Sequence, residues 1–570
     1  MSSTIRHTQT MQISYRSRSL RKLAAGLLAL SAINASLPAA VRYWDANGSG
    51  TGIGGTGTWQ LGAPALWNGS STGTGTLYNW VNNTSAPDIA HFGGTAGTVS
   101  VVSSTENPIV ALSLVFSTAG YTLSGGAITM PLAGTQTIVE VQATGGDTIV
   151  NNDLNLVVPV DSSGPRYRIF NRSAGTLTLN GNVNLVMDAS TTSRTYDVDQ
   201  FDAGGKIILN GTFSSNPGDG TASIRFGENG GVDGVTYEMN GNNINGLDGG
   251  SRLYRGTLLL GHANALGGAA DKIIRLGGSG TLAGQTAAIL TNAAMTIVND
   301  ITLGNSGSTT ATYILGGATA EASIYSGGIT ANNSMPLTLR AAAGGTVEFS
   351  GFINHMAAKM IKDGAGTVSL TRAAGNSGTG DVEVKAGTLL VTNTSGSAHG
   401  SGNITVETGA TLGGTGRIAP GTGTKLTLQS GAVLLGGLGE DSTGTLTIQG
   451  GVDFLSNSVI KLVLGPDNAH SSIARTGTGV WSFQADQLFT FDLLDGADTG
   501  TYAGILTGIA AGTDVSGWRV SPSTGIDGYF QMSGTNVDFI VSAIPEPSTA
   551  LLLTAGLMTI TLLRRRRATI

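Results

Sequence analysis

Hydrophobic and polar residues alternate in short runs along most of the chain, and glycine separates one run from the next. Typical runs are AGTLTLNGNVNLV (174–186), AGTLLVTNT (386–394) and TGTLTIQGGVDFL (443–455). Leu, Val or Ile occupies every second position, which is the period of a strand with one buried face. Glycine provides the backbone conformations that tight corners need. No segment between residue 41 and the C-terminal tail shows the period of an amphipathic helix, so the pattern predicts an all-β body.

Strands that recur roughly every 8–12 residues are compatible with a sandwich, a propeller or a solenoid. The runs contain similar but non-identical words, GTLTL, GTLLL, GTLLV and GTLTI, which favours stacked turns with equivalent residues above one another. We therefore predict a right-handed parallel β-solenoid. At about 20–25 residues per turn, the body would form about 20 turns and a rod on the order of 100 Å long.

The N-terminus has the organisation of a secretory signal. Four basic residues within 16–22 precede the apolar stretch Leu23–Ile33, and small residues follow through Ala39 and Ala40. This order predicts export through the Sec machinery and cleavage by signal peptidase near Ala39 or Ala40. We expect the segment to form a signal helix.

The C-terminus ends in a short apolar segment between two distinctive motifs. The uncharged segment Thr549–Leu563 would span roughly 22 Å as a helix, and basic residues behind it would stay on the cytoplasmic side of a membrane. We expect a single transmembrane helix that anchors the protein transiently in the inner membrane. The flanking residues are Pro545, Glu546, Pro547 and Ser548 before the segment, and Arg564, Arg565, Arg566 and Arg567 after it.

This three-part tail resembles the PEP-CTERM sorting signal of Gram-negative bacteria. The resemblance implies processing by an exosortase and release to the cell surface or the exopolysaccharide matrix. A simple tail anchor with a chance Pro-Glu-Pro is the alternative.

Composition limits the possible functions. The chain has 88 Gly, no Cys and 40% hydrophobic residues, so it can bury a core but has no disulfide, thiolate nucleophile or Cys-ligated zinc. Without the nine basic residues and one acid at the two ends, 21 basic and 35 acidic residues remain, a formal charge of −14. An acidic body disfavours nucleic acid as a partner.

The segment 362–416 resembles the autotransporter-associated β-strand repeat of passenger-type surface proteins. Degenerate copies are RGTLLLGHANALGG (255–268) and AAAGGTVEFSG (341–351). The resemblance implies a β-helical surface rod and says little about activity. No long barrel of alternating aromatic strands follows in this chain, and the sorting tail stands in that place.

These patterns divide the chain into five predicted parts. The last part of the body has longer alternating runs, and we expect it to close the open end of the solenoid. The parts are a signal peptide (1–40), an N-terminal cap with the first turns (41–235), the repeat solenoid (236–480), a terminal β cap (481–543) and the sorting tail (544–570).

Candidate catalytic groups are few. Glu383 and Lys385 lie two residues apart on one predicted strand, so their side chains share a face, and Arg372 is near in sequence. A surface cross-strand pair explains this cluster as well as a reaction centre does. We expect no catalysis. A carbohydrate-binding or carbohydrate-cleaving β-helix is the alternative, because hydrolysis would need a pair of carboxylates in one groove.

Metal and cofactor sites are not expected. Acidic turns supply Asp492, Asp495, Asp498 and Asp219, but they follow neither the EF-hand loop nor the glycine-rich calcium repeat, so turn formation explains them better. The six His residues have no metal-binding spacing. Glycine-rich words at 276–284 and 412–421 open no predicted helix and do not resemble phosphate loops.

Aromatic residues gather at the start of the mature chain. They either cover the end of the solenoid or stack on sugars, and we favour the cap. These residues are Trp44, Trp59, Trp67, Tyr78 and Trp80. Together the patterns predict an exported structural or adhesive rod at the cell surface or in the extracellular matrix, with exopolysaccharide or neighbouring cells as partners.

Overall fold

The computed structural model describes residues 39–543, except 49, 84–85, 133, 159–165, 188–192, 216–220, 230–231, 269–272, 279–280, 282, 305–310, 332–334, 440–441 and 523–524. The predicted signal helix and the sorting tail, with its transmembrane helix, fall outside the described residues. Within the described part helix is limited to short 3-10 turns such as η1 (Pro466–Asn468), and no helix there is long and apolar enough to cross a bilayer.

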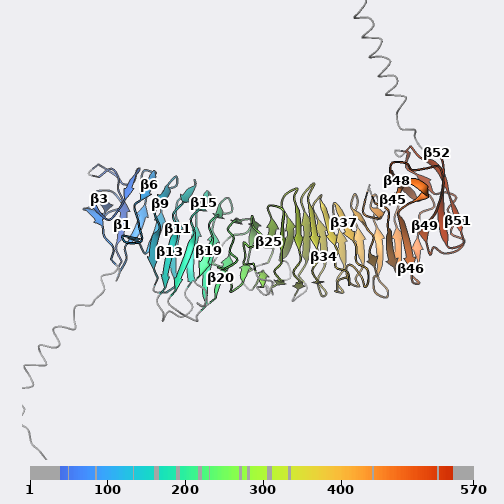
Figure 1. The fold of residues 1–570 in the computed structure, drawn as a ribbon, viewed down its shortest axis with the longest axis horizontal. Helices are drawn as coiled ribbons and strands as arrows, with labels where there is room; N and C mark the ends of the chain where they lie inside the picture. Colours follow the sequence, from blue (N-terminus) through green and yellow to red (C-terminus); the bar gives the residue numbers. More distant parts are fainter. Residues whose placement is uncertain are drawn as a thin grey trace, which may run out of the picture.

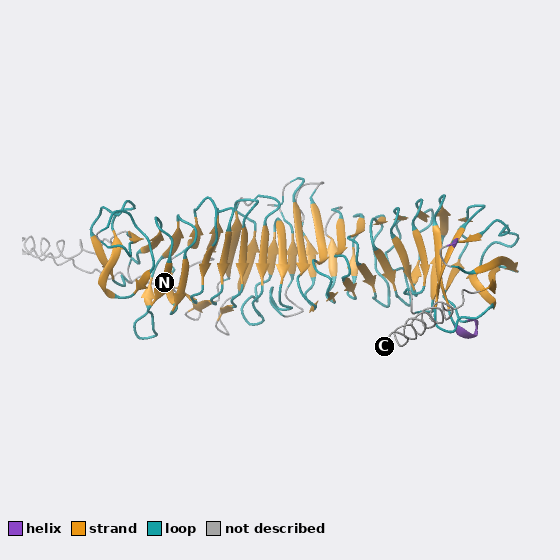
Figure 2. Cartoon of the chain, turned by 90° about the horizontal axis from the view of Figure 1, so that it is seen from above, coloured by secondary structure: helices purple, strands orange, loops and turns teal. Residues whose placement is uncertain are grey.

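The described chain forms an elongated rod that runs from β1 at its N-terminal end to β52 at its C-terminal end (Figure 1). Strands of successive turns pair in parallel and stack side by side along the rod axis (Figure 2). This confirms the predicted all-β parallel solenoid. Its right-handedness stays a prediction.

Each full turn passes through three faces. The first face carries twelve parallel strands in the N-terminal part of the rod, with the antiparallel pair β3 and β4 beside β1. The strands are β1 (Val41–Trp44), β3 (Gly62–Asn68), β4 (Leu77–Trp80), β5 (Ile89–Phe92), β8 (Ser113–Phe116), β11 (Gln136–Val141), β14 (Arg166–Asn171), β17 (Arg194–Gln200), β20 (Ala222–Phe226), β22 (Ser251–Leu253), β24 (Ile274–Leu276), β27 (Ile301–Leu303), β30 (Ile329–Ala331) and β33 (Ile353–Asn354).

After a gap, a second sheet occupies the same place in the turn. Its strands are β40 (Arg417–Ile418), β43 (Thr445–Gln449), β46 (Ser472–Thr476), β49 (Gly500–Thr507), β52 (Asn536–Ala543) and β51 (Asp527–Ser533).

The second face is a ladder of parallel strands that extends along nearly the whole rod. Its strands are β2 (Gly57–Trp59), β6 (Thr98–Val101), β9 (Thr122–Gly125), β12 (Thr148–Val150), β15 (Thr176–Leu179), β18 (Lys206–Leu209), β21 (Thr236–Met239), β23 (Gly256–Leu260), β25 (Thr286–Thr291), β28 (Thr312–Gly317), β31 (Leu337–Ala341), β34 (Met360–Asp363), β36 (Val382–Val384), β38 (Ile404–Val406), β41 (Lys425–Leu428), β44 (Gly451–Phe454) and β47 (Trp481–Ser482).

The third face also consists of two sheets in sequence. The first contains β7 (Ile109–Val110), β10 (Ile128–Pro131), β13 (Leu154–Val158), β16 (Val183–Met187) and β19 (Phe213–Ser215). The second contains β26 (Met295–Ile297), β29 (Ala322–Tyr325), β32 (Thr346–Phe349), β35 (Thr367–Leu370), β37 (Thr388–Val391), β39 (Thr411–Gly414), β42 (Val433–Gly436), β45 (Val459–Leu464), β48 (Leu488–Leu493) and β50 (Arg519–Val520).

The length of a turn changes along the rod. In the N-terminal half, Asn180 donates to Asn151 and Asn210 donates to Asn180, across separations of 29 and 30 residues. In the C-terminal half, Asn403 donates to Asp381 across 22 residues. The predicted 20–25 residues per turn therefore describe only some of the turns. Ile89 pairs with Ser113 after 24 residues near the N-terminal end, whereas Val459 pairs with Leu488 after 29 residues near the C-terminal end.

The core is a column of apolar side chains inside the rod. In β15, Leu177 and Leu179 are buried while Thr176 and Thr178 are only partly buried, as the alternation predicts. Because the parallel strands keep register, Leu258, Ile289 and Leu315 lie above one another on consecutive strands, and all three are buried. Similar side chains in adjacent turns thus pack into one continuous interior.

Candidate functional site

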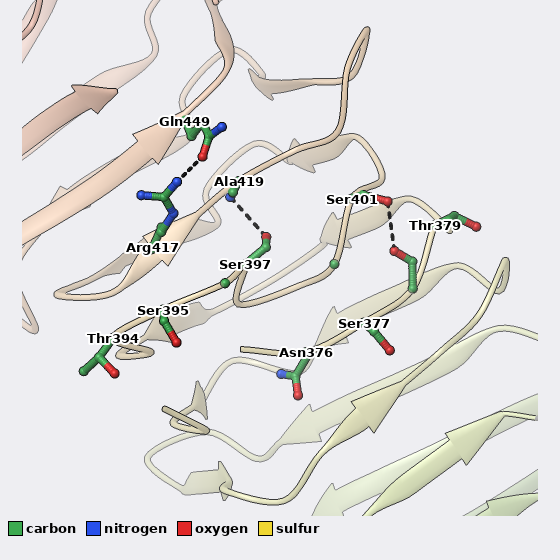
Figure 3. Close-up of a pocket in the computed structure, with 13 residues that line it drawn as sticks. Asn376, Ser377, Thr379, Thr394, Ser395, Ser397, Ser401, Arg417, Ala419 and Gln449 are labelled. Carbon is green, nitrogen blue, oxygen red and sulfur yellow. Dashed lines mark hydrogen bonds between the residues drawn. The ribbon is translucent and has the colours of Figure 1, made fainter. Parts of the chain in front are cut away.

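A groove in the described residues lies where the first face loses its strands. The first sheet of that face ends at β33, the second begins at β40, and two turns between them cross this face without a strand. The resulting groove has a volume of about 710 Å³ (Figure 3). It is lined by Asn376, Ser377, Gly378, Thr379, Thr394, Ser395, Gly396, Ser397, Gly400, Ser401, Arg417, Ala419 and Gln449.

Asparagine side chains replace the missing strand bonds. The Asn376 side-chain amide accepts from the backbone N–H of Ile353 (2.9 Å) and donates to the carbonyl of Ala398 (2.8 Å), so it joins three turns. Asn393 accepts from the N–H of Arg417 at 2.9 Å in the same way. Side-chain amides can pair with both backbone donors and acceptors, which lets the chain leave the strand conformation without orphaned polar groups.

The floor of the groove rests on two buried histidines. His355 is fully buried, and its Nδ1 and Nε2 lie 2.7 and 2.8 Å from the carbonyl oxygens of Ala358 and His399. Both partners are carbonyl oxygens, which can only accept a hydrogen bond. Gly378 packs directly against this ring, since a Cβ at position 378 would lie 2.4 Å from His355 Nε2.

His399 is arranged for the neutral form. Its Nε2 lies 3.2 Å from the carbonyl of Gly402, which accepts a hydrogen bond, and its Nδ1 lies 3.0 Å from the hydroxyl of Ser397. Burial, the largest cause, and the charge of His355 lower the pKa of His399 to about 4, against the Gly402 contact that raises it. Ser397 also accepts from the N–H of Ala419 at 3.1 Å, so this histidine is connected to the groove wall (Figure 3).

The chemistry of the groove is that of a polar binding surface. Its lining has hydroxyls, amides and one guanidinium, that of Arg417, which donates to the Gln449 side chain (Figure 3). No carboxylate, histidine or lysine lines the groove. Such a surface can hydrogen-bond to a hydroxyl-rich or anionic ligand.

The candidate residues Arg372 and Glu383 each contact a residue outside the candidate cluster. Glu383 pairs with Lys359 of the preceding turn (2.5 Å), and the guanidinium of Arg372 lies 4.6 Å from the ring centre of Phe352. In the described residues no ion pair joins any two of the three predicted residues. Both contacts join side chains of neighbouring turns on the outer surface of the rod.

The N-terminal aromatic residues pack into one cluster at the end of the rod. Trp44, Trp59, Trp67 and Trp80 are each no more than 2% exposed, with ring centres of Trp67 and Trp80 4.5 Å apart. The four tryptophans are therefore packed inside the end of the rod, and their role as an end cap stays a prediction. Tyr78 differs, because it is 38% exposed and the Arg42 guanidinium lies 3.9 Å from its ring centre.

The acidic turns form local contacts. Asp492 pairs with Lys461 at 2.8 Å, and Asp498 accepts from the backbone N–H of Asp467 at 3.2 Å. The described residues contain no group of three or more His, Asp and Glu side chains that could hold a metal ion. Asp219 lies outside the described residues, as do the sorting motif 545–548 and the arginines 564–567.

The groove and a set of stacked arginines escaped the sequence-based analysis. A signal for the stacked arginines was present in the sequence. One Arg lies between two buried positions in each of the segments SIRF (223–226), SRL (251–253) and IRL (274–276). The groove had no such signal, since it depends on the absence of strands.

Comparison with known proteins relates the chain to an adhesin. No protein-family model matches the chain. Over 475 residues, which cover 77% of this chain, it is 29% identical to the adhesin BmaC autotransporter of Brucella suis biovar 1 (strain 1330). The chain spans only 13% of the length of that relative. Most of this β-solenoid is therefore similar to a part of an autotransporter adhesin.

Proposed function

We propose that the chain is an exported structural and adhesive protein of the bacterial cell surface or extracellular matrix, and that it performs no catalysis. The observation that carries the proposal is the architecture, a long parallel solenoid whose polar turns are displayed along a continuous apolar core. The similarity to an autotransporter adhesin supports it, because the two chains match over most of this body.

Within this function, the groove between β33 and β40 is the proposed contact surface for a polar ligand. Its hydroxyl and amide groups suit the hydroxyls of a carbohydrate, and Arg417 suits an acidic substituent. Carbohydrate binding is therefore the second candidate function. Carbohydrate cleavage has no support in the groove, because its lining offers no carboxylate.

Attachment of cells tests the adhesive function. We expect deletion of the gene from its native bacterium to lower attachment to the polysaccharide extracted from that bacterium's matrix, and the wild-type gene to restore it. Arg417→Gln should restore it only partly, while Lys425→Gln, which removes an exposed cation from the next strand of the second face, should restore it fully. Unchanged attachment after deletion would contradict adhesion. Full restoration by Arg417→Gln would instead remove the groove from the proposal.

We also propose that the tail directs sorting. After export by the Sec machinery, the segment from Thr549 to Leu563 would hold the protein in the inner membrane while an exosortase processes it near Pro545. The support is the order of the sequence motifs, Pro-Glu-Pro, apolar segment and arginines, behind a signal peptide.

Intact-mass measurement of fractionated cells tests sorting separately from adhesion. We expect a surface-fraction mass that ends near Pro545, which disappears without the exosortase or in a Pro545→Ala, Pro547→Ala double variant. Full-length protein in the inner membrane of both strains would reject processing and leave a simple tail anchor.

A further inference from the structure

Three arginines stand in register on consecutive strands of the first face. Arg225 of β20 pairs in position with Arg252 of β22, and Arg252 pairs in position with Arg275 of β24. Each lies between buried neighbours, so all three side chains are on the outer side of the sheet. We call Arg225, Arg252 and Arg275 the arginine ladder. Adjacent parallel strands are about 4.8 Å apart, which places like charges at that spacing.

Along the arginine ladder, the described carboxylates form ion pairs with arginines only at its N-terminal end. Arg166 lies 3.4 Å from Asp197 and 3.1 Å from Glu228, and Arg225 lies 3.0 Å from Glu228. Farther along, the Arg252 guanidinium donates to the Tyr254 hydroxyl at 3.0 Å, and Arg275 is exposed. Of the described carboxylates, none forms an ion pair with Arg252 or Arg275.

This pattern is unusual for the molecule. Elsewhere the outer faces pair opposite charges between neighbouring turns, as in Lys206–Glu238, Lys359–Glu383 and Lys461–Asp492. Stacked cations without an acid repel one another, and the body of the chain is acidic overall. The ladder is therefore a local positive site on the surface of an acidic body.

The ladder also borders a small hollow. A depression of about 70 Å³ is lined by Ser223, Ile224, Arg225, Gly249, Gly250, Ser251, Arg252 and Arg275. Gly249 and Gly250 contribute no side chains to this lining. The carboxylate of Asp248 is turned to the backbone, where it accepts from the N–H of Ala222 at 2.6 Å. The hollow is of a size for one carboxylate or sulfate group, and it is much smaller than the groove.

We infer that the arginine ladder binds an anionic polysaccharide, with one carboxylate or sulfate group in the hollow and the chain of sugars along successive turns. Guanidinium groups match such anions with paired N–H donors. Charges repeated along a polymer suit cations repeated at one-strand spacing. Nucleic acid fits less well, because the ladder has only three cations, Glu228 pairs with one of them, and the surrounding body is acidic.

Binding to purified full-length protein tests the inference without dependence on sorting or on the groove. The probes are a heparin fragment as the sulfated chain, oligogalacturonate as the carboxylated chain, dextran as the neutral chain, and a short DNA duplex. We expect one or both anionic glycans to bind with an affinity that falls as salt rises, and dextran not to bind. Arg252→Gln with Arg275→Gln should weaken binding by about tenfold or more.

Matched variants separate the ladder from general charge. Lys385→Gln with Lys425→Gln also removes two exposed cations and should leave the affinity within about twofold. Arg275→Lys keeps the charge but not the planar donor pair, and should lie between wild type and the double variant. Equal losses in both double variants, equal binding of dextran, or tighter binding of the DNA duplex would each overturn the inference.

Discussion

The ammonium nitrogen of Lys362 lies 2.6 Å from the carbonyl oxygen of Ala386 in the next turn, inside the rod. Lys362 stands in the inward column between Leu339 and Val384, and it is only 1% exposed. It also donates to the carbonyl of Gly364 at 2.6 Å. A cation thus replaces an apolar residue in the core, and backbone carbonyls, not carboxylates, are its partners.

The first prediction concerns the stability that this lysine contributes at different pH. Burial lowers the pKa of Lys362 to about 8, against 10.5 for an exposed lysine. Between these values the unfolded chain binds more protons than the folded chain, so stability rises with pH in that window. We expect wild type to gain about 2 kcal/mol from this source between pH 7.5 and 9.5. The measurement is the urea midpoint at both values.

Lys362→Met is the matched variant, because it keeps a long side chain without the charge. It should lose the rise in stability between pH 7.5 and 9.5, and the two orphaned carbonyls should lower its stability by roughly 1–3 kcal/mol at pH 9.5. An identical pH response of the two proteins would show that Lys362 is not the source.

The fold was accessible from the sequence because alternation is local. The runs that contain Thr176–Leu179 and Thr388–Val391 show their buried face without knowledge of their neighbours. Lys362 was not predictable in the same way. Its inward position follows from the pairing with Leu339, and its sequence context, KDGAGT, has the composition of an exposed turn.

The arginine ladder and the groove were not predictable, because both depend on the register between strands of successive turns, which the sequence does not show. The ladder residues are 27 and 23 residues apart, so no fixed repeat brings Arg225, Arg252 and Arg275 together. The groove arises because Asn376 and Asn393 take over strand hydrogen bonds. A single Asn between glycine-rich words looks like an ordinary turn residue, and only the stacked turns show that a face has lost its strands.

The second prediction concerns the groove at acidic pH. The pKa of His399 is lowered to about 4, so between pH 6.5 and 4 the unfolded chain binds the proton that the folded chain excludes. Stability from this group is complete above pH 6.5 and decreases as the pH falls, by up to about 3 kcal/mol. Protonation would also remove the acceptor that Ser397 uses, and so loosen the wall at Ala419.

Urea unfolding and hydrogen exchange at pH 7 and pH 4.5 measure this effect. In wild type we expect faster exchange at residues 394–403 at the lower pH than at strands far away. His399→Gln places an amide that can donate and accept hydrogen bonds at this position, but the amide cannot titrate. The variant should therefore lose less stability than wild type between pH 7 and pH 4.5. Other acids in the chain titrate too, for example Asp199, whose pKa burial raises to about 6. The difference between the two proteins is therefore the diagnostic quantity.

The third prediction compares two glycines with positive φ. Gly378 has φ 146° and would place a Cβ 2.4 Å from the His355 ring, whereas Gly423 has φ 83° and open space around its Cβ position. Both alanine variants carry the backbone strain of a positive φ, of roughly 1–2 kcal/mol. Gly378→Ala also carries the clash, so we expect it to lose about 1–3 kcal/mol more than Gly423→Ala. Equal urea midpoints for the two variants would mean that the His355 ring moves away from the new Cβ without a measurable loss of stability.

The last prediction distinguishes the end cap from a glycan-binding aromatic surface. Trp67 is 1% exposed, and its ring centre lies 5.0 Å from that of Trp59 and 5.3 Å from that of Trp44. Trp67→Ala should lower stability by about 3–5 kcal/mol. Because each turn of a solenoid contacts only its neighbours, the damage should appear as proteolysis and rapid exchange in β1 and β5. Tyr78→Ala removes an exposed ring and should change stability by about 1 kcal/mol or less. If Trp67→Ala instead left β1 and β5 protected but abolished binding to polysaccharide, the cluster would be a ligand surface and not a cap.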